Sequence, residues 1–207
     1  FSDPDTNNAE ADEQLAAAIK RHGQVVLAAD NVPAGDGVMR IVPPCDVLFE
    51  SAAAIGSAER LPDADLVVRK HTPRGDSPVS MMSWVTAELL KADIAKNPAA
   101  EPWVRWMNYY GRPGFIRSWS YYQALNPALA PSAEFSNKVV YVGAKIFTKF
   151  AGDRKDEFPN PFSVFESRPS FMAGVEIQAT EFLNLLRGDW LTRPRLAVER
   201  TLFILLG

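Results

Sequence analysis

Cysteine and histidine are almost absent from this sequence of 207 residues. Cys45 is the one cysteine, so no disulfide can form within the chain, and the two histidines, His22 and His71, lie far apart. Zinc sites are built mostly from clustered Cys and His ligands, so the composition argues against one. A carboxylate site for Ca²⁺ or Mg²⁺ stays open at this point. The low cysteine content fits a cytosol and equally fits a bacterial periplasm.

The sequence also lacks an excess of charge of one sign. Its 22 Lys and Arg residues against 25 Asp and Glu give a net charge of −3 and a pI of about 5.5. Nucleic-acid-binding proteins usually carry a basic stripe and a high pI, so we expect no nucleic-acid partner. A hydrophobic content of 47% and a charged content of 23% are typical of a globular domain and argue against a wholly disordered chain.

Recognisable catalytic motifs are missing as well. The sequence contains no glycine-rich phosphate or dinucleotide loop, no nucleophile elbow and no His-Glu-x-x-His signature. Asp63 and Asp65 are spaced as in calcium loops, but the rest of that pattern is absent, so a solvated turn is favoured. His22, His71 and Cys45 have no accompanying motif, which favours structural or solvent-exposed roles. We expect no catalytic residue, no metal and no cofactor.

Long hydrophobic runs are absent, apart from a short one at residues 201–206. A helix that spans a bilayer needs about 20 apolar residues. Two interpretations remain open: residues 195–207 are the start of a transmembrane segment, or the run is a short core helix or strand. The arginines before the run are typical of cytoplasmic flanks and argue against the first interpretation. Because the first residue is Phe, we interpret the chain as an excised fragment.

Helix and strand patterns alternate along the chain. Amphipathic spacing predicts helices at 12–21, 78–91 and 174–187, glycines stop the first and last of these, and a serine cap predicts a short helix at 118–125. Apolar runs predict strands at 24–29, 66–70, 103–108 and 138–143, the last of which reads as the clearest buried strand. The proline and glycine content of residues 30–46 and the polar, proline-rich composition of residues 151–171 predict long loops. This alternation indicates an α/β fold with a mainly parallel central sheet and flanking helices in one domain over 1–194.

The turn at residues 108–114 is the most informative stretch. Two glycines and a proline impose an unusual backbone path where aromatics, an amide and Arg112 follow a predicted strand. Ligands of open α/β sheets tend to bind beyond the carboxyl ends of the strands. The alternative is that the tyrosines pack and the glycines only turn the chain. Glu176, in the first turn of a predicted helix, is explained by the helix dipole alone.

Ten segments, in order, carry a resemblance to a known family: residues 1–5, 12–16, 23–27, 62–69, 107–114, 120–121, 135–144, 156–162, 174–179 and 185–191. Together they resemble the second CHASE family, the extracytoplasmic sensor domains of bacterial receptor cyclases, histidine kinases and related signalling proteins. Two positions depart from the pattern, since the family usually has Gly where Leu66 stands and often Thr where Asn160 stands. The family's opening strand and helix are absent, so we expect an uncovered strand edge or apolar face that invites pairing with another chain.

The resemblance implies a sensor domain without catalytic activity at the periplasmic or extracellular face of the cell membrane. The parent protein would be anchored by transmembrane helices outside this sequence and would carry a cytoplasmic cyclase or kinase domain. We expect an unknown small-molecule ligand and a homodimer, with the state of the ligand passed through the flanking transmembrane helices.

Five residues are candidates for contacts with that ligand: Arg69, Asn108, Tyr110, Arg112 and Lys145. They stand at or just after predicted strand ends and offer hydrogen-bond donors to an anionic or polar molecule. Two alternatives remain. One is a periplasmic α/β hydrolase or carbohydrate-processing enzyme with acid and base carboxylates such as Asp156 and Glu176. The other is a dimerisation module that binds no ligand.

Overall fold

The computed structural model describes residues 2–35, 38–74, 77–100, 103–145, 156–165, 170–192 and 196–206. The α-helices are α1 (Ala9–His22), α2 (Asp46–Phe49), α3 (Met82–Leu89), α4 (Tyr121–Ala124), α5 (Gly174–Arg187) and α6 (Leu196–Leu206). The strands are β1 (Val26–Pro33), β2 (Met39–Val42), β3 (Ala54–Ser57), β4 (Lys70–His71), β5 (Arg105–Trp106), β6 (Glu157–Pro159) and β7 (Phe171–Ala173). Short 3₁₀ turns include η1 (Asp93–Lys96) and η2 (Pro98–Ala100), which follow α3.

The helices form where the sequence predicts them. The predicted helix at 12–21 is α1, and the one at 174–187 is α5 with the same bounds. Both end at a glycine with φ near +70°, Gly23 at +71° and Gly188 at +67°, a conformation that costs other residues energy. The predicted helix at 78–91 is confirmed as the shorter α3. Ser120 caps α4 in a reciprocal capping box with Gln123, as the serine predicts.

The predicted mainly parallel central sheet is not present in the described part of the chain. Instead there are three small sheets, ordered β2-β1-β3, β4-β5 and β6-β7. Only β1 and β3 run parallel among the paired strands, with Val26 opposite Ala54, whereas the β1–β2, β4–β5 and β6–β7 pairs are antiparallel. The short connection between β1 and β2 favours antiparallel pairing of these two strands, because a parallel crossover needs a longer connection. The α/β class holds, while the sheet topology was predicted wrongly.

Two predicted loops and one predicted strand also need correction. The 30–46 loop is largely the β1–β2 hairpin, and the described part of the 151–171 loop contains β6 and the start of β7; residues 151–155 and 166–169 of that prediction lie outside the described residues. The predicted buried strand at 138–143 is not a strand, and Val139, Val140 and Val142 are exposed. A run of strand-forming residues forms a ladder only where a partner strand lies beside it.

The two departures from the family pattern have clear local geometries. Leu66 has φ +64°, the left-handed conformation that glycine adopts without strain, so the turn keeps a glycine-type geometry despite the leucine. Asn160 is buried, and its amide donates to the Ser170 carbonyl at 3.0 Å while its oxygen accepts from the Phe162 N–H at 2.8 Å. Asn160 therefore holds β6 close to the residue that precedes β7.

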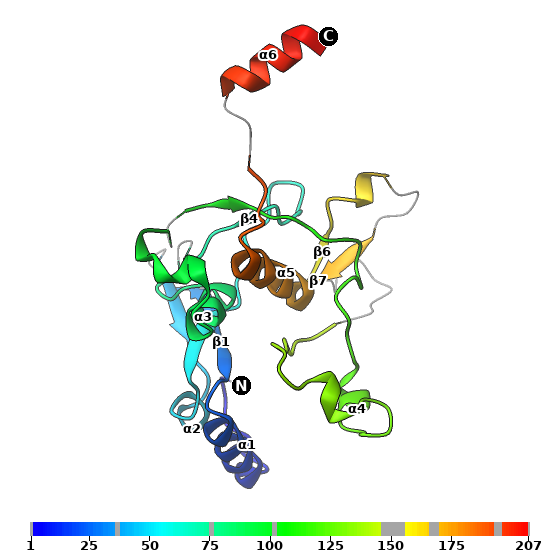
Figure 1. The fold of residues 1–207 in the computed structure, drawn as a ribbon. Helices are drawn as coiled ribbons and strands as arrows, with labels where there is room; N and C mark the ends of the chain where they lie inside the picture. Colours follow the sequence, from blue (N-terminus) through cyan, green and yellow to red (C-terminus); the bar gives the residue numbers. More distant parts are fainter. Residues whose placement is uncertain are drawn as a thin grey trace.

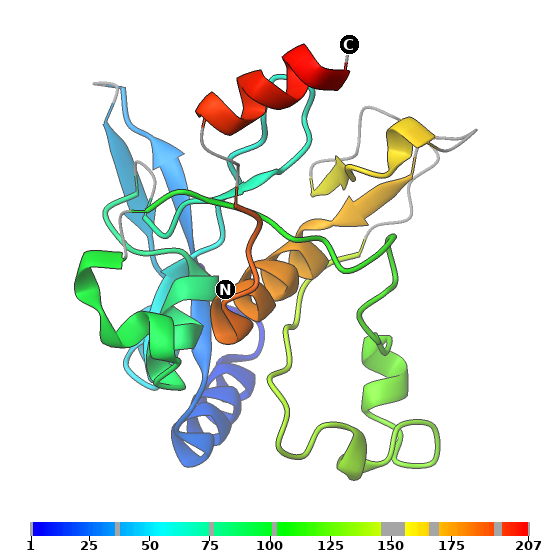
Figure 2. The same cartoon turned by 45° about the horizontal axis from the view of Figure 1, so that its top comes forward.

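Helix α5 is the centre of the molecule (Figure 1). It lies between the β2-β1-β3 sheet with α3 on one side and the β6–β7 hairpin on the other (Figure 2). Phe182 and Leu185 pack with Trp84 of α3 in one apolar cluster, and Ile177 packs with Met172 in a second. A third cluster joins α1 and α2. Because two of the three clusters use α5, this helix ties the halves of the domain together.

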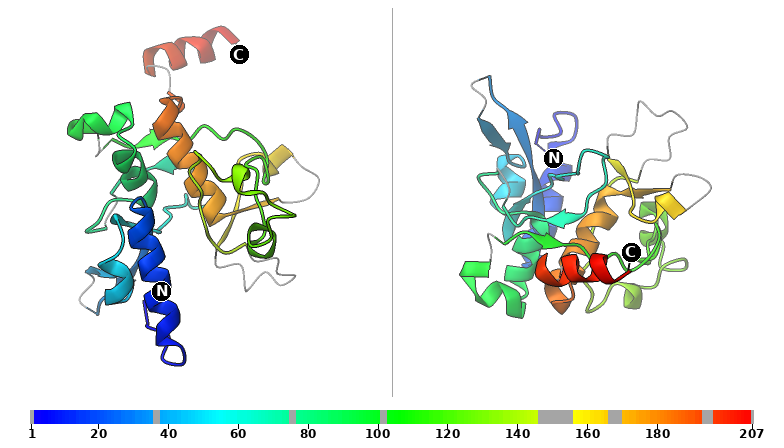
Figure 3. Two further views of the ribbon diagram at one scale, coloured as in Figure 1. Left: turned by 60° about the horizontal axis from the view of Figure 1, so that its bottom comes forward. Right: turned by 90° about the horizontal axis from the view of Figure 1, so that it is seen from above.

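The helices α1 and α6 lie at opposite ends of the molecule (Figures 1 and 3). Near the C-terminal end of α6 the apolar side chains of Ile204, Leu205 and Leu206 are exposed. Within the described ranges, no helix has both the length and the apolar character needed to cross a membrane.

The close approach of β3 to α3 gives a stability prediction. A Cβ atom on Gly56 would lie 2.6 Å from the Met82 Cα atom and 2.9 Å from the Met82 nitrogen, so backbone would have to move. We expect Gly56→Ala to lower the free energy of unfolding by about 1–3 kcal/mol, measured by urea titration with circular dichroism. Gly35→Ala is the control, because nothing lies within 4 Å of a Cβ atom there. Equal unfolding curves for the two variants would show that β3 does not press on α3.

Candidate functional site

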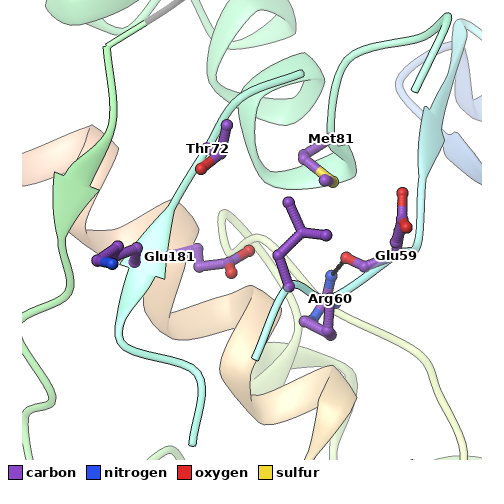
Figure 4. A pocket seen from close by; sticks show the side chains of 7 residues that line it. Glu59, Arg60, Thr72, Met81 and Glu181 are labelled. Atoms are coloured by element: carbon purple, nitrogen blue, oxygen red, sulfur yellow. Dashed lines mark hydrogen bonds between the residues drawn. The ribbon is translucent and has the colours of Figure 1, made fainter. Parts of the chain in front are cut away.

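A small recess opens beside the middle of α5 (Figure 4). We call it the central recess, and its lining residues are Glu59, Arg60, Leu61, Lys70, Thr72, Met81 and Glu181. They come from the segment after β3, from β4 and its C-terminal neighbour, from the start of α3 and from α5. The cavity volume is about 10 Å³, close to the least that holds one water molecule. The recess as a whole contains about 190 Å³ of empty space, open solvent included.

Arg60 forms the cationic side of the central recess. Its Nη1 donates to the Glu59 carbonyl, and its Nη2 donates to the carbonyl of Gly174 at 3.4 Å, where α5 begins. The Nε atom is buried without a hydrogen-bond partner. Within the described chain, no carboxylate lies within ion-pair distance of this guanidinium. Burial lowers the pKa of Arg60, while the negative charges of Glu181 and Asp156 act in the opposite direction.

Glu181 forms the acidic side of the central recess and belongs to a buried polar chain. Its Oε2 accepts from the Ser83 hydroxyl at 3.3 Å, and Ser83 Oγ lies 3.0 Å from His71 Nε2. All three side chains are buried, and they connect α5, α3 and β4. Since the Ser83 proton is given to Glu181, the Ser83 oxygen accepts from a proton on His71 Nε2. Burial raises the pKa of Glu181, against the opposing effects of Arg60 and Ser83.

His71 is held neutral in this chain. Burial first, and then the positive charges of Arg105 and Arg60, lower its pKa to about 3. Its Nδ1 atom is buried and has no hydrogen-bond partner. The sequence-based expectation of a structural role for His71 therefore agrees with its position in the core.

A second polar cluster fixes the C-terminal end of α5. The carboxamide of Asn184, which is buried, accepts from the Asn108 N–H at 2.7 Å and donates to the Asn108 carbonyl at 3.0 Å. The Asn108 side chain donates to the Asp189 carbonyl at 3.1 Å. We call the set Asn108, Tyr110, Asn184 and Asp189 the α5 clamp. It joins the segment after β5 to the helix and to the residues that follow the helix.

Tyr110 completes the α5 clamp. Its hydroxyl donates to Asp189 Oδ1 at 2.6 Å and accepts from Asn184 Nδ2 at 3.0 Å. Burial, helped by the hydrogen bond to Asp189, raises the pKa of Tyr110 to about 12, so the phenol keeps its proton. The guanidinium of Arg187 lies 5.0 Å from the centre of the Tyr110 ring, within range of a cation–π contact.

Arg105 secures the same region from the side of α3. Its guanidinium lies 5.6 Å from the Trp84 ring centre and 5.1 Å from that of Trp190. It also donates to the carbonyls of Trp103 and Ala100 at 2.7 Å and 2.5 Å. The Leu191 N–H donates to the Trp106 carbonyl at 2.8 Å, so the chain after α5 is paired with β5. Residues 188–191 are thus attached to the domain at several points.

Arg69, another predicted ligand contact, is occupied by a local ion pair. Its two Nη atoms lie 2.7 Å and 2.6 Å from the two carboxylate oxygens of Asp65, and Nη1 is 3.1 Å from Asp63. The hydrogen bonds from Arg69 lower the pKa of Asp65 to about 2. The bonds to Asp65 raise the pKa of Arg69 in turn. The pair of aspartates noted in the sequence therefore serves this arginine as acceptors.

The structure brings together some of the five predicted contacts and leaves others apart. Asn108 and Tyr110 meet in the α5 clamp, and the Arg69 carbonyl accepts from the Met107 N–H on the neighbouring segment at 2.8 Å. Arg112 and Lys145 are exposed. Whether any of these residues contacts a ligand stays a prediction.

The two carboxylates of the hydrolase alternative have other tasks. Glu176 accepts from the Gly114 N–H at 2.8 Å, which ties the turn at 111–114 to the start of α5. Asp156 is close to Gly174, so that a Cβ atom there would lie 2.1 Å from Asp156 Oδ1. Burial raises the pKa of Asp156 while Arg60 opposes the rise. The buried acid that the sequence analysis missed is Glu181.

The signal that could have found Glu181 was present in the sequence. It stands four residues from both Ile177 and Leu185, so it shares the apolar face of the helix, where a carboxylate is unexpected. Arg60 gave no such signal, since it follows a glutamate in a loop. The polar chain and the recess form only where β4, α3 and α5 come together in the fold, so the sequence alone did not reveal them.

Two buried polar clusters thus contact the central helix α5 in the described part of the chain: the polar chain of His71, Ser83 and Glu181, and the α5 clamp. The family model described as CHASE2 domain matches residues 1–207. The chain therefore belongs to the CHASE2 domain family, which comprises extracytoplasmic sensor domains of signalling proteins and not catalytic domains. No curated protein and no solved structure matches the chain.

The buried state of His71 predicts a loss of stability in acid. Below pH 6.5 an unfolded histidine binds a proton, whereas folded His71 stays neutral until about pH 3, so the free energy of unfolding falls as the pH drops through that window. The raised pKa of Glu181 acts the other way above pH 4.5, because the folded state then binds the extra proton.

Replacing His71 with Gln isolates the histidine contribution. Between pH 7 and pH 4.5, we expect the wild-type chain to lose on the order of 2 kcal/mol more than His71→Gln, as measured by urea unfolding at each pH. His22→Gln is the control, since His22 is exposed at the end of α1, and it should follow the wild-type curve. A His71→Gln curve parallel to that of the wild type would contradict the assignment.

Proposed function

We propose that this chain is the extracytoplasmic signal-sensing domain of a membrane-bound bacterial signal-transduction receptor. The match of the CHASE2 family over residues 1–207 is the observation that supports it. In this proposal the receptor is anchored by transmembrane helices outside the sequence and controls a nucleotide cyclase or a kinase in the cytoplasm. The domain binds a small ligand and works as a homodimer.

Helix α5 is the element suited to pass the signal on. It borders the central recess through Glu181 and reaches the α5 clamp one turn later through Asn184. The clamp binds Asp189, and Arg105 and Trp106 hold the next two residues, so the chain that precedes α6 is attached to the domain here. A ligand shifts a two-state domain only by its differential affinity for the two states. An element that contacts both the recess and residues 188–191 can link a change at one to a change at the other. Helix α5 is such an element.

The location can be tested by labelling. In the full-length protein, Tyr121→Cys places a thiol on a residue that is 73% exposed, and a Cys45→Ser background removes the single cysteine of this sequence. We expect a membrane-impermeant maleimide to label Tyr121→Cys in intact spheroplasts as fully as in detergent-lysed ones. Labelling only after lysis would place the domain on the cytoplasmic side and overturn the proposal.

The α5 clamp gives a functional prediction. Tyr110→Phe removes the hydroxyl that joins Asn184 to Asp189, at a cost of about 0.5–1.5 kcal/mol in stability, since one hydrogen-bonding group is lost. In the full-length receptor, we expect the basal cyclase or kinase output to change by about twofold to tenfold, as for a coupling energy of this size.

Tyr122→Phe is the matched control, because Tyr122 is 73% exposed and lies outside the clamp. It should leave both the melting temperature and the output close to wild type. If Tyr110→Phe lowers the melting temperature but leaves the output unchanged, the clamp is structural and does not carry the signal.

A further inference from the structure

The central recess holds two opposite charges that do not meet. Arg60 and Glu181 both line it, and Figure 4 shows their side chains on different sides of the space. Neither has a partner of opposite charge within ion-pair distance in the described chain. Buried charges are usually paired, so two unpaired ones across a shared cavity call for an explanation.

The donors of Arg60 are not used up. Its two Nη atoms donate to backbone carbonyls, one of them at the long distance of 3.4 Å, and its Nε has no acceptor. A carboxylate is the group that a guanidinium binds best, because two parallel hydrogen bonds can form. The recess therefore offers one free place for an anionic group.

The acidic side offers a complementary place for a cation. Glu181 is buried, and the Ser83 hydroxyl at 3.3 Å is the one donor to it that the described structure shows. The second glutamate of the recess, Glu59, is engaged through Oε2 with the Asn31 amide at 2.6 Å. Burial raises the pKa of Glu181, and an ammonium group beside it would supply the positive charge that favours the ionised carboxylate.

The charges of the recess discriminate between ligand classes. A simple anion would meet the carboxylates of Glu181 and Glu59, and a simple cation would meet Arg60 and Lys70. We propose that the central recess binds a small zwitterion, an α-amino acid, with its carboxylate on Arg60 and its ammonium group on Glu181. This inference rests on the proposed sensor function and names the class of its ligand.

The size of the recess restricts the choice further. The cavity is water-sized in the structure described, so entry requires Leu61, a lining residue that is 38% exposed, to move outward. Only the smallest side chains then fit, which favours glycine and alanine over larger amino acids. The outward movement of the segment after β3 also pulls on the Arg60 contact to Gly174 at the start of α5. Binding is in this way linked to the helix that reaches the clamp.

The test is a binding measurement on the full-length protein with glycine and L-alanine as probes. Calorimetric melting should show a rise in melting temperature with either amino acid, since a ligand of the folded state stabilises it. Acetate and methylammonium, each carrying one of the two charges, should give no comparable rise at the same concentration. A rise with acetate alone would show a plain anion site, and no rise with either amino acid would overturn the proposal.

Variants assign the effect to the recess. Glu181→Gln keeps the size of the side chain and removes its charge, and we expect it to weaken glycine binding by about tenfold to hundredfold. Glu50→Gln, on an exposed residue directly after α2, should leave the affinity unchanged. Arg60→Lys, which retains the charge but not the fork of donors, provides a second variant should Glu181→Gln fold poorly, and it should also weaken binding. Unchanged affinity in both recess variants would refute the site.

The two proposals fail in different ways. If glycine binds and depends on Glu181 while the output of the receptor does not respond to it, the site stands and its role in sensing is wrong. If the receptor proves to be a sensor whose response is untouched by Glu181→Gln, the sensor function stands and this site is wrong.

Discussion

The side chain of Asn184 makes the hydrogen bonds to the backbone of Asn108 that a neighbouring strand would otherwise make. The segment after β5 passes over α5 without a sheet partner for Asn108, and the buried carboxamide of Asn184 pairs both the N–H and the carbonyl of that residue. Buried backbone groups must be paired, so the position of this segment depends on that one amide. This position in turn places Tyr110 beside Asp189, so it also fixes the chain directly after Gly188.

The interior is also constrained by its charges. The guanidinium groups of Arg60 and Arg105 both act on His71, and among the described residues Glu181 is the one buried carboxylate of this core. Burial is the main reason why His71 stays neutral at a lowered pKa, and its protonation would also add a third positive charge to this core. Backbone carbonyls and two indole rings carry Arg105 instead of a carboxylate. Carbonyl dipoles and indole rings therefore stabilise the buried charge of Arg105 in the core.

The helices could be predicted because their signals are local. The glycine stops and the apolar spacing of α5 lie within 15 consecutive residues and gave the observed bounds. The strand prediction at 138–143 depended on a neighbour that no local pattern encodes, and the described chain places none beside it. For the site, the turn at 108–114 pointed to Asn108 and Tyr110, but only the fold shows that Asn184 and Asp189 meet them. Glu181 stood out only as a carboxylate on the apolar face of its helix, and no pattern linked it to Arg60, which lies 121 positions away in the chain.

The packing of Arg105 between two tryptophans gives the domain an intrinsic optical reporter. Trp190 follows the clamp by one residue and shares the guanidinium with Trp84, whose ring is fully buried against α5. Any displacement of the chain beyond α5 changes the polar surroundings of one indole and leaves the other in place. One of the five tryptophans of the sequence, Trp190, therefore contributes to the fluorescence of the unlabelled protein a component that depends on the position of residues 188–191.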